Sequence, residues 1–245
     1  AAFGFGAPPL IEGIEFEDDN LSPEIALNYY LNDNTSVYVA YKKAFKSGGI
    51  DNSALPTASI NPLSPTFEGF DALIYDSEEA DGFEIGLKSN LFDNNMRINA
   101  TYYKYEYTDL QVQLFDANII QFSTFNAGAV ETEGFEADML WYTDIEGLTL
   151  RGQFAWTDAV NTGDFFNTSG VNLKGSERSY SPEIAGSLGL SYDSSLFSGW
   201  RYTFSTDARY SDDYAWGVYK NSPRQDSFWI NDAAISIYSD DGKHS

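Results

Sequence analysis

The chain has 245 residues, with 14 Lys and Arg against 37 Asp and Glu, a net charge of -23, one His and no Cys. The lack of Cys excludes disulfides, thiolate metal sites and a thiol nucleophile, and the only His, His244, stands beside the end of the sequence, which disfavours His-based acid–base chemistry. The negative charge disfavours nucleic acid as a partner, and an aromatic content of 16% excludes a simply disordered chain.

Along the chain the dominant signal is an alternation of apolar and polar residues with a period of two, which predicts β-strands with two different faces. No segment has the apolar spacing of a helix, and no apolar run is long enough for a transmembrane helix. Near Tyr102 and Tyr103 the apolar set changes parity, which predicts a β-bulge. The nine predicted strands are 23–31, 36–46, 81–91, 96–114, 119–142, 148–160, 182–193, 200–213 and 226–238, with a tenth if residues 10–17 form another.

The predicted connections alternate in length. Short polar turns are expected at 32–35, 93–95, 143–147 and 193–195, whereas longer connections are expected at 47–80, 161–181 and 214–225, with a shorter one near 115–118. Short turns on one side and long loops on the other indicate an antiparallel up-and-down transmembrane β-barrel of the outer-membrane kind. The segments 96–114 and 119–142 exceed the roughly 9–11 residues that cross a bilayer, so they are expected to project beyond it.

Alternation alone does not separate a membrane barrel from a soluble β-sandwich, because both have one apolar face. Three features favour the barrel: charged residues in mid-strand, Tyr and Trp near the predicted strand ends, and strands that are long for a sandwich. In the barrel interpretation the mid-strand charges line the lumen and form ion pairs there. These lumen-facing residues are Glu136, Asp138, Arg151, Arg201, Asp207 and Arg209.

Six segments, in this order, carry a resemblance to one protein family. They are Leu21-Ser-Pro-Glu-Ile-Ala-Leu-Asn-Tyr29, the stretch 37–49 ending Phe45-Lys-Ser-Gly-Gly49, Phe83-Glu-Ile-Gly-Leu-Lys88, the stretch 100–111 with Asp109-Leu-Gln111, Asn126-Ala-Gly128 followed by Gly134-Phe-Glu136, and Ser181-Pro-Glu-Ile-Ala185. Together they resemble the C-terminal half of the barrel of TonB-dependent outer-membrane receptors. No single segment is specific, but the set covers residues 20–240.

The resemblance implies a barrel of about 22 strands in the outer membrane of a Gram-negative bacterium, surrounded by lipid and lipopolysaccharide. It also implies an N-terminal plug that binds TonB, and loops that capture a small-molecule nutrient, most often a ferric siderophore. We therefore expect residues 1–245 to be a partial barrel domain of 9–10 strands, without the plug, the first half of the barrel or the last strands. No enzyme activity, cofactor, metal site or nucleic-acid partner is expected. The lumen-facing charges would anchor the plug or hydrate the wall.

The family resemblance places ligand contacts on the long loops, where aromatic and charged residues suit a flat chelate. The alternative is that these residues form an aromatic rim or pack loop against loop. The candidates are Phe67, Phe70, Tyr75, Phe165, Phe166, Arg178, Tyr214, Trp216, Tyr219, Lys220 and Arg224. The acidic clusters 76–81 and 17–19 lack the spacing of an EF-hand, so solvated loop ends are a better interpretation than Ca²⁺ sites.

Three functions remain open at this point. An active receptor coupled to TonB is the leading hypothesis, and a passive outer-membrane porin shares the same kind of wall. A soluble carbohydrate-binding β-sandwich is the third, whereas a hydrolase would need a base that His244 is badly placed to provide. The sequence does not identify the ligand.

Overall fold

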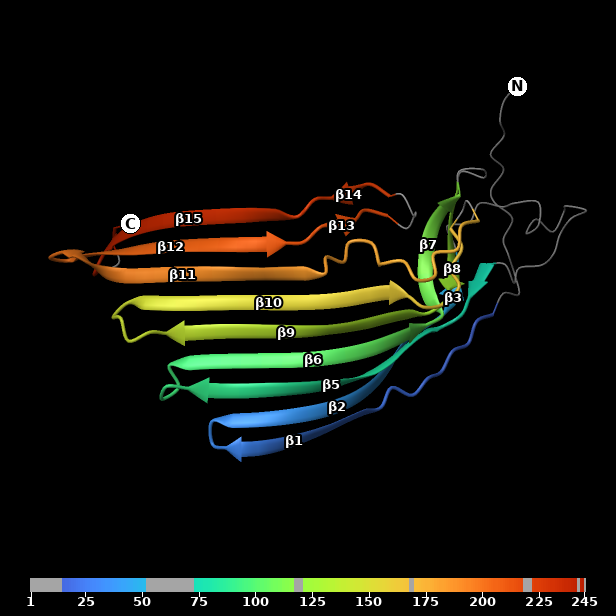
Figure 1. Cartoon of the computed structure of the whole chain (residues 1–245), viewed down its shortest axis with the longest axis horizontal. Coiled ribbons are helices and arrows are strands. Elements are labelled where there is room, and N and C mark those ends of the chain that lie inside the picture. Colours follow the sequence, from blue (N-terminus) through green and yellow to red (C-terminus); the bar gives the residue numbers. More distant parts are fainter. Residues whose placement is uncertain are drawn as a thin grey trace, which may run out of the picture.

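A computed structural model describes residues 15–51, 73–116, 121–167, 170–217, 222–241 and 243–244. Nine antiparallel strands form one sheet in which each strand lies beside the next main strand of the chain (Figure 1), as the alternation predicts. The described residues contain no helix that is long and apolar enough to cross a membrane. The strands are β1 (Glu24–Asn32), β2 (Thr35–Lys46), β5 (Glu78–Leu91), β6 (Met96–Thr108), β9 (Val130–Tyr142), β10 (Leu148–Asn161), β11 (Ile184–Phe197), β12 (Trp200–Ser211) and β15 (Phe228–Ser239).

The connections alternate as expected. Short turns join β1 to β2, β5 to β6, β9 to β10 and β11 to β12 at one end of the sheet, and long connections lie at the other end (Figure 1). We call these the turn end and the loop end. The long connections carry three small two-stranded sheets, made of β3 (Gly49–Ile50) with β4 (Ile74–Tyr75), β7 (Leu110–Asp116) with β8 (Gln121–Ala127), and β13 (Tyr214–Ala215) with β14 (Arg224–Gln225).

Three local predictions are wrong. The long strands 96–114 and 119–142 are each divided, because Asp109 takes a positive φ of 52° and residues 128–129 are not in a strand. The β7–β8 hairpin therefore forms a separate sheet. No bulge occurs at Tyr102 and Tyr103, since β6 pairs without a register shift with both neighbours. Residues 193–195 are not a turn, because β11 continues to Phe197 and the chain reverses at Gly199, whose φ is 79°. The tenth strand falls mostly outside the described residues, and residues 15–17 are not in a strand.

The register gives the sheet two faces of different chemistry. Residues paired across neighbouring strands share a face, and one face carries the apolar residues of every main strand. On this apolar face Leu27, Leu188 and Ile235 are each 67–70% exposed. None of the described side chains is completely buried. Water disfavours so large a continuous apolar surface, so this face requires an apolar neighbour.

The opposite, polar face contains three glycines that lie directly between two interacting side chains. Tyr38 passes over Gly86 and shares a hydrogen bond with Thr101 on the next strand, at 3.1 Å between the two hydroxyl oxygens. Tyr103 passes over Gly134 in the same way and bonds Thr157 at 3.2 Å. Arg151 passes over Gly189 to Asp207.

In each case an added Cβ on the central glycine would lie within 2.6 Å of the crossing side chain. The missing side chain therefore lets strands two positions apart interact directly.

At the loop end, the β7–β8 hairpin packs on the connection between β10 and β11. Ala127, Phe165 and Leu173 are almost completely buried there, with Val112, Leu114 and Phe125 packed against them. This small hydrophobic core lies outside the nine-stranded sheet, so the described loops form a folded layer with its own packing.

Candidate functional site: the polar face and the loop end

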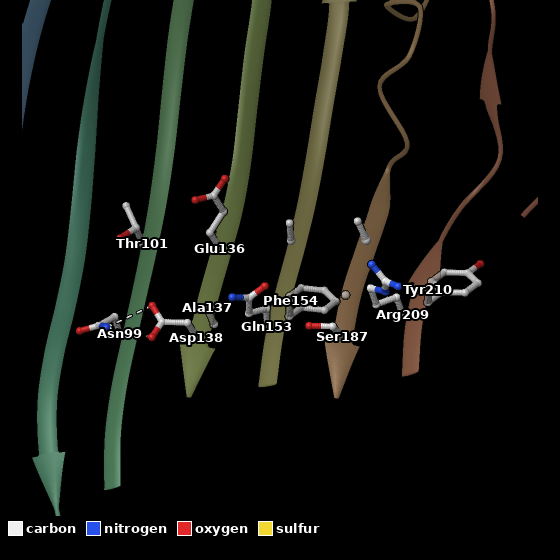
Figure 2. A pocket seen from close by; sticks show the side chains of 13 residues that line it. Asn99, Thr101, Glu136, Ala137, Asp138, Gln153, Phe154, Ser187, Arg209 and Tyr210 are labelled. Carbon is white, nitrogen blue, oxygen red and sulfur yellow. Dashed lines mark hydrogen bonds between the residues drawn. The ribbon is translucent and has the colours of Figure 1, made fainter. Parts of the chain in front are cut away.

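A shallow hollow of about 540 Å³ lies on the middle of the polar face. Figure 2 shows Asn99, Thr101, Glu136, Asp138, Gln153 and Arg209 spread across neighbouring strands around it. The amide of Asn99 donates to both carboxylate oxygens of Asp138, at 3.1 and 3.0 Å. The side chain of Glu136 forms no hydrogen bond or ion pair with another residue in the described part of the chain, so its carboxylate is available to a group outside this chain.

All six predicted lumen residues lie on this polar face, because the register connects them across neighbouring strands. Their ion pairs only partly match the expected partners. Arg151 bonds Asp207, with Nη2–Oδ2 at 2.5 Å and Nε–Oδ1 at 3.1 Å. The other two arginines pair with aspartates that the sequence interpretation missed: Arg209 with Asp232 at 2.5 Å, and Arg201 with Asp193.

Both missed aspartates belong to the polar set of their strands. Asp232 lies on β15 directly opposite Asp207 and pairs diagonally with Arg209, two residues further along β12. Asp193 was assigned to a turn, but in the structure it lies within β11 and also accepts hydrogen bonds from Thr203 and Tyr238. The period-two pattern could have placed both residues on this face, but it could not have paired them.

A second polar group lies nearer the loop end. Glu84 accepts hydrogen bonds from Lys42 Nζ at 2.9 Å and from the Tyr105 hydroxyl at 2.5 Å, both on the same carboxylate oxygen. Tyr103, Tyr105 and Tyr107 are the odd-numbered residues behind the predicted bulge, and the register places them on the polar face. The hydroxyls of Tyr103 and Tyr105 have polar partners there. The polar face thus combines ion pairs with tyrosines across its whole width.

On the apolar face, a row of charged residues lies between the exposed apolar residues and the loop end of the sheet. Lys43 pairs with Glu79 at 2.8 Å, and Lys104 pairs with Glu131 at 2.8 Å. Below this row, three aromatic side chains donate toward carboxylates: Tyr41 to Asp81 at 3.3 Å, Tyr102 to Glu133 at 3.1 Å and Trp156 to Glu183 at 3.2 Å. Aromatic rings with one apolar and one polar end favour a boundary between hydrocarbon and water.

The acidic clusters at the loop end are engaged in local contacts. Glu78 accepts the backbone N–H of Gln111 at 2.8 Å, and Asp18 accepts the Ser77 hydroxyl at 2.6 Å and the backbone N–H of Gly48 at 3.1 Å. The hydrogen bond from Ser77 is the main cause that lowers the pKa of Asp18 below its usual value. No group of three or more metal-ligating side chains occurs in the ranges that the structure describes.

Among the predicted ligand contacts, Phe67, Phe70, Tyr219 and Lys220 lie outside the described residues. Phe165 is only 3% exposed and belongs to the core of the loop layer, which is the packing alternative left open by the sequence. Phe166 and Trp216 are half exposed or more, at 56% and 50%. The remaining aromatic candidates are Tyr75 in β4 and Tyr214, whose ring lies 6.1 Å from that of Tyr180.

Arg178 and Arg224 are the two candidates that the structure brings together, since both line a hollow of about 340 Å³ in the loop layer. Arg224 pairs with Glu177 and with Asp213, the latter at 2.7 Å. These carboxylates raise the pKa of Arg224. Burial has the opposite effect on Arg178 and lowers its pKa. The two guanidinium groups therefore differ in how far their charge is compensated.

The geometry defines a class of protein: an open antiparallel wall with alternating turns and long loops, an apolar band on one face and a charged opposite face. The chain belongs to the TonB-dependent receptor β-barrel family, because residues 3–240 match the family described as TonB dependent receptor-like, beta-barrel. No curated protein sequence matches the chain.

Solved structures of similar fold support the assignment. The ferric yersiniabactin uptake receptor FyuA from Yersinia pestis superimposes with a TM-score of 0.68 at 15% identity, over 89% of this chain and 30% of that one. The siderophore receptor PiuA from Acinetobacter baumannii gives 0.64 at 20% identity, over 91% and 30%. BauA, the ferric preacinetobactin receptor from the same organism, gives 0.64 at 18%, over 89% and 29%. The chain thus spans about three tenths of the length of these receptors.

Proposed function

We propose that this chain forms part of the wall of an active outer-membrane receptor that imports a ferric siderophore with energy supplied through TonB. Membership of the TonB-dependent receptor family is the observation that carries this proposal. The similar solved structures include a ferric yersiniabactin uptake receptor, a siderophore receptor and a ferric preacinetobactin receptor, which supports this ligand class.

The outer-membrane location rests on the apolar face. This face carries exposed apolar residues, then aromatic side chains with polar ends, then a row of ion pairs toward the loop end. This order is the one expected for a β-barrel wall that passes from lipid into water. Lipid and lipopolysaccharide are therefore the proposed neighbours of this face. A soluble β-sandwich would need a second apolar layer over it, and the described residues provide none.

On the polar face, we assign Glu136, Asp138, Arg151, Arg201, Asp207 and Arg209 to the water-filled interior of the barrel. Arg151, Arg201 and Arg209 are already paired within the wall. Glu136 has no such partner among the described residues, so it is the proposed contact for a basic residue of a plug that would bind TonB. The exposed aromatic loop residues Phe166 and Trp216 and the half-buried Arg178 are the proposed ligand contacts that the structure describes.

Uptake of iron-loaded siderophores tests the proposal. The gene that encodes this chain is deleted, and accumulation of radioactive iron is measured with a panel of ferric siderophores, with and without a functional TonB. Loss of uptake of one chelate in both the deletion and the TonB-deficient strain is the expected result. Uptake that needs the gene but not TonB would favour the passive porin instead.

A further inference from the structure

Arg178 lies on the polar side of the sheet, next to the end of β10 that adjoins the loop layer. The segment 176–178 pairs with the end of that strand, through a bridge between Val160 and Glu177 and a hydrogen bond from Arg178 N to Ala159 O at 2.8 Å. Residues that lie opposite each other in this pairing share a side, so Arg178 lies with Ala159 and Asn161 and Glu177 lies with Val160, although the Glu177 side chain also reaches the edge of the same hollow. Arg178 therefore shares the side of Asn161, facing the same space as the polar face below.

The Arg178 guanidinium has few protein partners. Its Nη1 donates to Asn161 Oδ1 at 3.0 Å, and no carboxylate lies within ion-pair distance among the residues that the structure describes. A guanidinium has five N–H donors, and burying an uncompensated charge is unfavourable. Burial lowers the pKa of Arg178, and the negative charge of Glu78 partly offsets this effect without a direct contact. Most of the donors of this half-buried cation are thus available.

Arg224 provides the contrast within the same hollow. Its guanidinium is engaged by Glu177 and Asp213 together, so the carboxylates nearest to the hollow are already used. Asn161, by comparison, is held in place: it is 5% exposed, and its amide donates to Ser176 O at 3.2 Å and to Ser176 Oγ at 3.0 Å. Asn161 Oδ1 is therefore a fixed acceptor for Nη1 of Arg178, and the rest of the guanidinium lines the hollow.

The hollow has room for a compact group. Its volume is about 340 Å³, and its wall includes Arg178, Asn161 and Ser176, the apolar side chains of Leu173 and Ala215, and the ion-paired Glu177 and Arg224. Leu173 also belongs to the packed core of the loop layer, so this side of the hollow is built on a folded scaffold.

We propose that this hollow is a subsite for a carboxylate group of the transported ligand, with Arg178 as the residue that determines this specificity. A carboxylate accepts two parallel N–H bonds from a guanidinium, and charge-assisted bonds of this kind are stronger than neutral ones. The inference rests on the proposed uptake function and narrows its substrate class to chelates with a free or metal-bound carboxylate, rather than neutral hydroxamate chelates.

Binding of simple anions tests the subsite without requiring the natural ligand. The complete product of the gene is purified in detergent, and citrate and inorganic phosphate are titrated by calorimetry against the natural protein and the variants R178Q, R178K and K174Q. Lys174 is the matched control, because it belongs to the same loop and carries the same charge, but its ion pair with Asp164, at 3.8 Å, is exposed and it does not line the hollow.

Saturable citrate binding that R178Q weakens by about tenfold or more is expected, since a bond to a charged group contributes roughly 1.5–3 kcal/mol. R178K should bind with intermediate affinity because it keeps the charge but not the planar fork. K174Q should bind as the natural protein does. Equal citrate affinity in R178Q, an equal loss in K174Q, tighter binding of phosphate than of citrate, or no saturable binding at all would overturn the proposal.

Two further measurements keep the result interpretable. Heat-modifiable migration on gels verifies that R178Q is folded, and R178K serves as the second variant if R178Q is not. Siderophore uptake in cells is measured separately: Arg178-dependent citrate binding without any TonB-dependent uptake would contradict the proposed function and leave the subsite standing, whereas uptake with no Arg178-dependent binding would do the reverse.

Discussion

Arg151 on β10 and Asp207 on β12 form a two-point ion pair directly above Gly189 of the strand between them. A Cβ atom at Gly189 would lie 2.5 Å from Arg151 Nε and 2.6 Å from Asp207 Oδ1. Both distances are shorter than van der Waals contact. The ion pair and the glycine therefore depend on each other, and the same arrangement holds for Tyr38 over Gly86 and for Tyr103 over Gly134.

The substitution Gly189→Ala should displace the ion pair and destabilise the folded protein modestly. The clashing atoms belong to flexible side chains that can move aside, and a solvent-exposed ion pair contributes at most about 1 kcal/mol. Equilibrium unfolding in urea measures the change, and a cycle with Arg151→Ala measures the coupling. Gly152→Ala is the control, because its Cβ would meet Leu188 at an ordinary 3.4 Å. Additive effects of Gly189→Ala and Arg151→Ala would contradict the interpretation.

Gly134→Ala should be more harmful than Gly189→Ala. Its Cβ would lie 2.6 Å from the backbone oxygen of Trp156 as well as 2.5 Å from the Tyr103 hydroxyl, and backbone cannot move aside as a side chain can. Overpacking of this kind costs about 1–3 kcal/mol. The same unfolding experiment ranks the two variants, and a Gly134→Ala protein as stable as the natural one would show that Tyr103 does not need this space.

Arg at position 188 should impair assembly, whereas Arg at position 187 should be tolerated. Leu188 lies on the apolar face and is 67% exposed, while the neighbouring Ser187 lies on the polar face beside the central hollow. A cationic side chain on the lipid face costs about 2–4 kcal/mol at the bilayer midplane. Heat-modifiable migration of Leu188→Arg and Ser187→Arg in isolated outer membranes reports assembly. Equal behaviour of the two variants would reject the assignment of the faces.

The loop layer should loosen when Asn126 or Gln111 is replaced by Ala. The Asn126 amide donates to Asp76 O at 2.9 Å and to Asp109 O at 2.7 Å, and the Gln111 amide donates to Ser47 O at 2.9 Å and to Asp76 O at 3.0 Å. Removing either amide leaves backbone carbonyls without these donors, at about 1 kcal/mol per bond. Hydrogen exchange in β7 and β8 should accelerate in both variants, while exchange in β10 and β11 stays unchanged. Acceleration across the whole sheet would contradict a local role.

Acid should release the contact that Asp18 makes with the β2–β5 connection. The hydrogen bond from Ser77 and the one from Gly48 lower the pKa of Asp18 in the folded state, so this contact stabilises the loop above the pKa of the unfolded chain. The contribution disappears as the pH falls through the lowered pKa of the folded state. NMR titration of the Asp18 carboxyl carbon should give a lower midpoint in the natural protein than in Ser77→Ala, and equal midpoints would exclude the Ser77 bond as the cause.

The division of the sheet into two faces could be read from the sequence because it depends on neighbouring residues alone. Alternating side chains point to opposite sides of any extended strand, so Leu188 and Ser187 are assigned to different faces without knowledge of their partners. The turns can be predicted for a similar reason, because Asp, Asn and Gly favour chain reversals through their own local conformational preferences. The error at Asp193 shows the limit of this rule, because Asp193 lies within a strand and accepts hydrogen bonds from Thr203 on β12 and Tyr238 on β15.

By itself, the sequence determined nine strands, their alternating connections, the apolar and charged faces and the resemblance to the receptor family. Only the tertiary structure decided which charges pair, that Phe165 belongs to a packed core, and that Arg178 faces a hollow with a single fixed partner. The physical reason is the range of the interactions. A period of two follows from the local geometry of one strand, whereas register, ion pairing and loop packing depend on contacts between residues tens of positions apart.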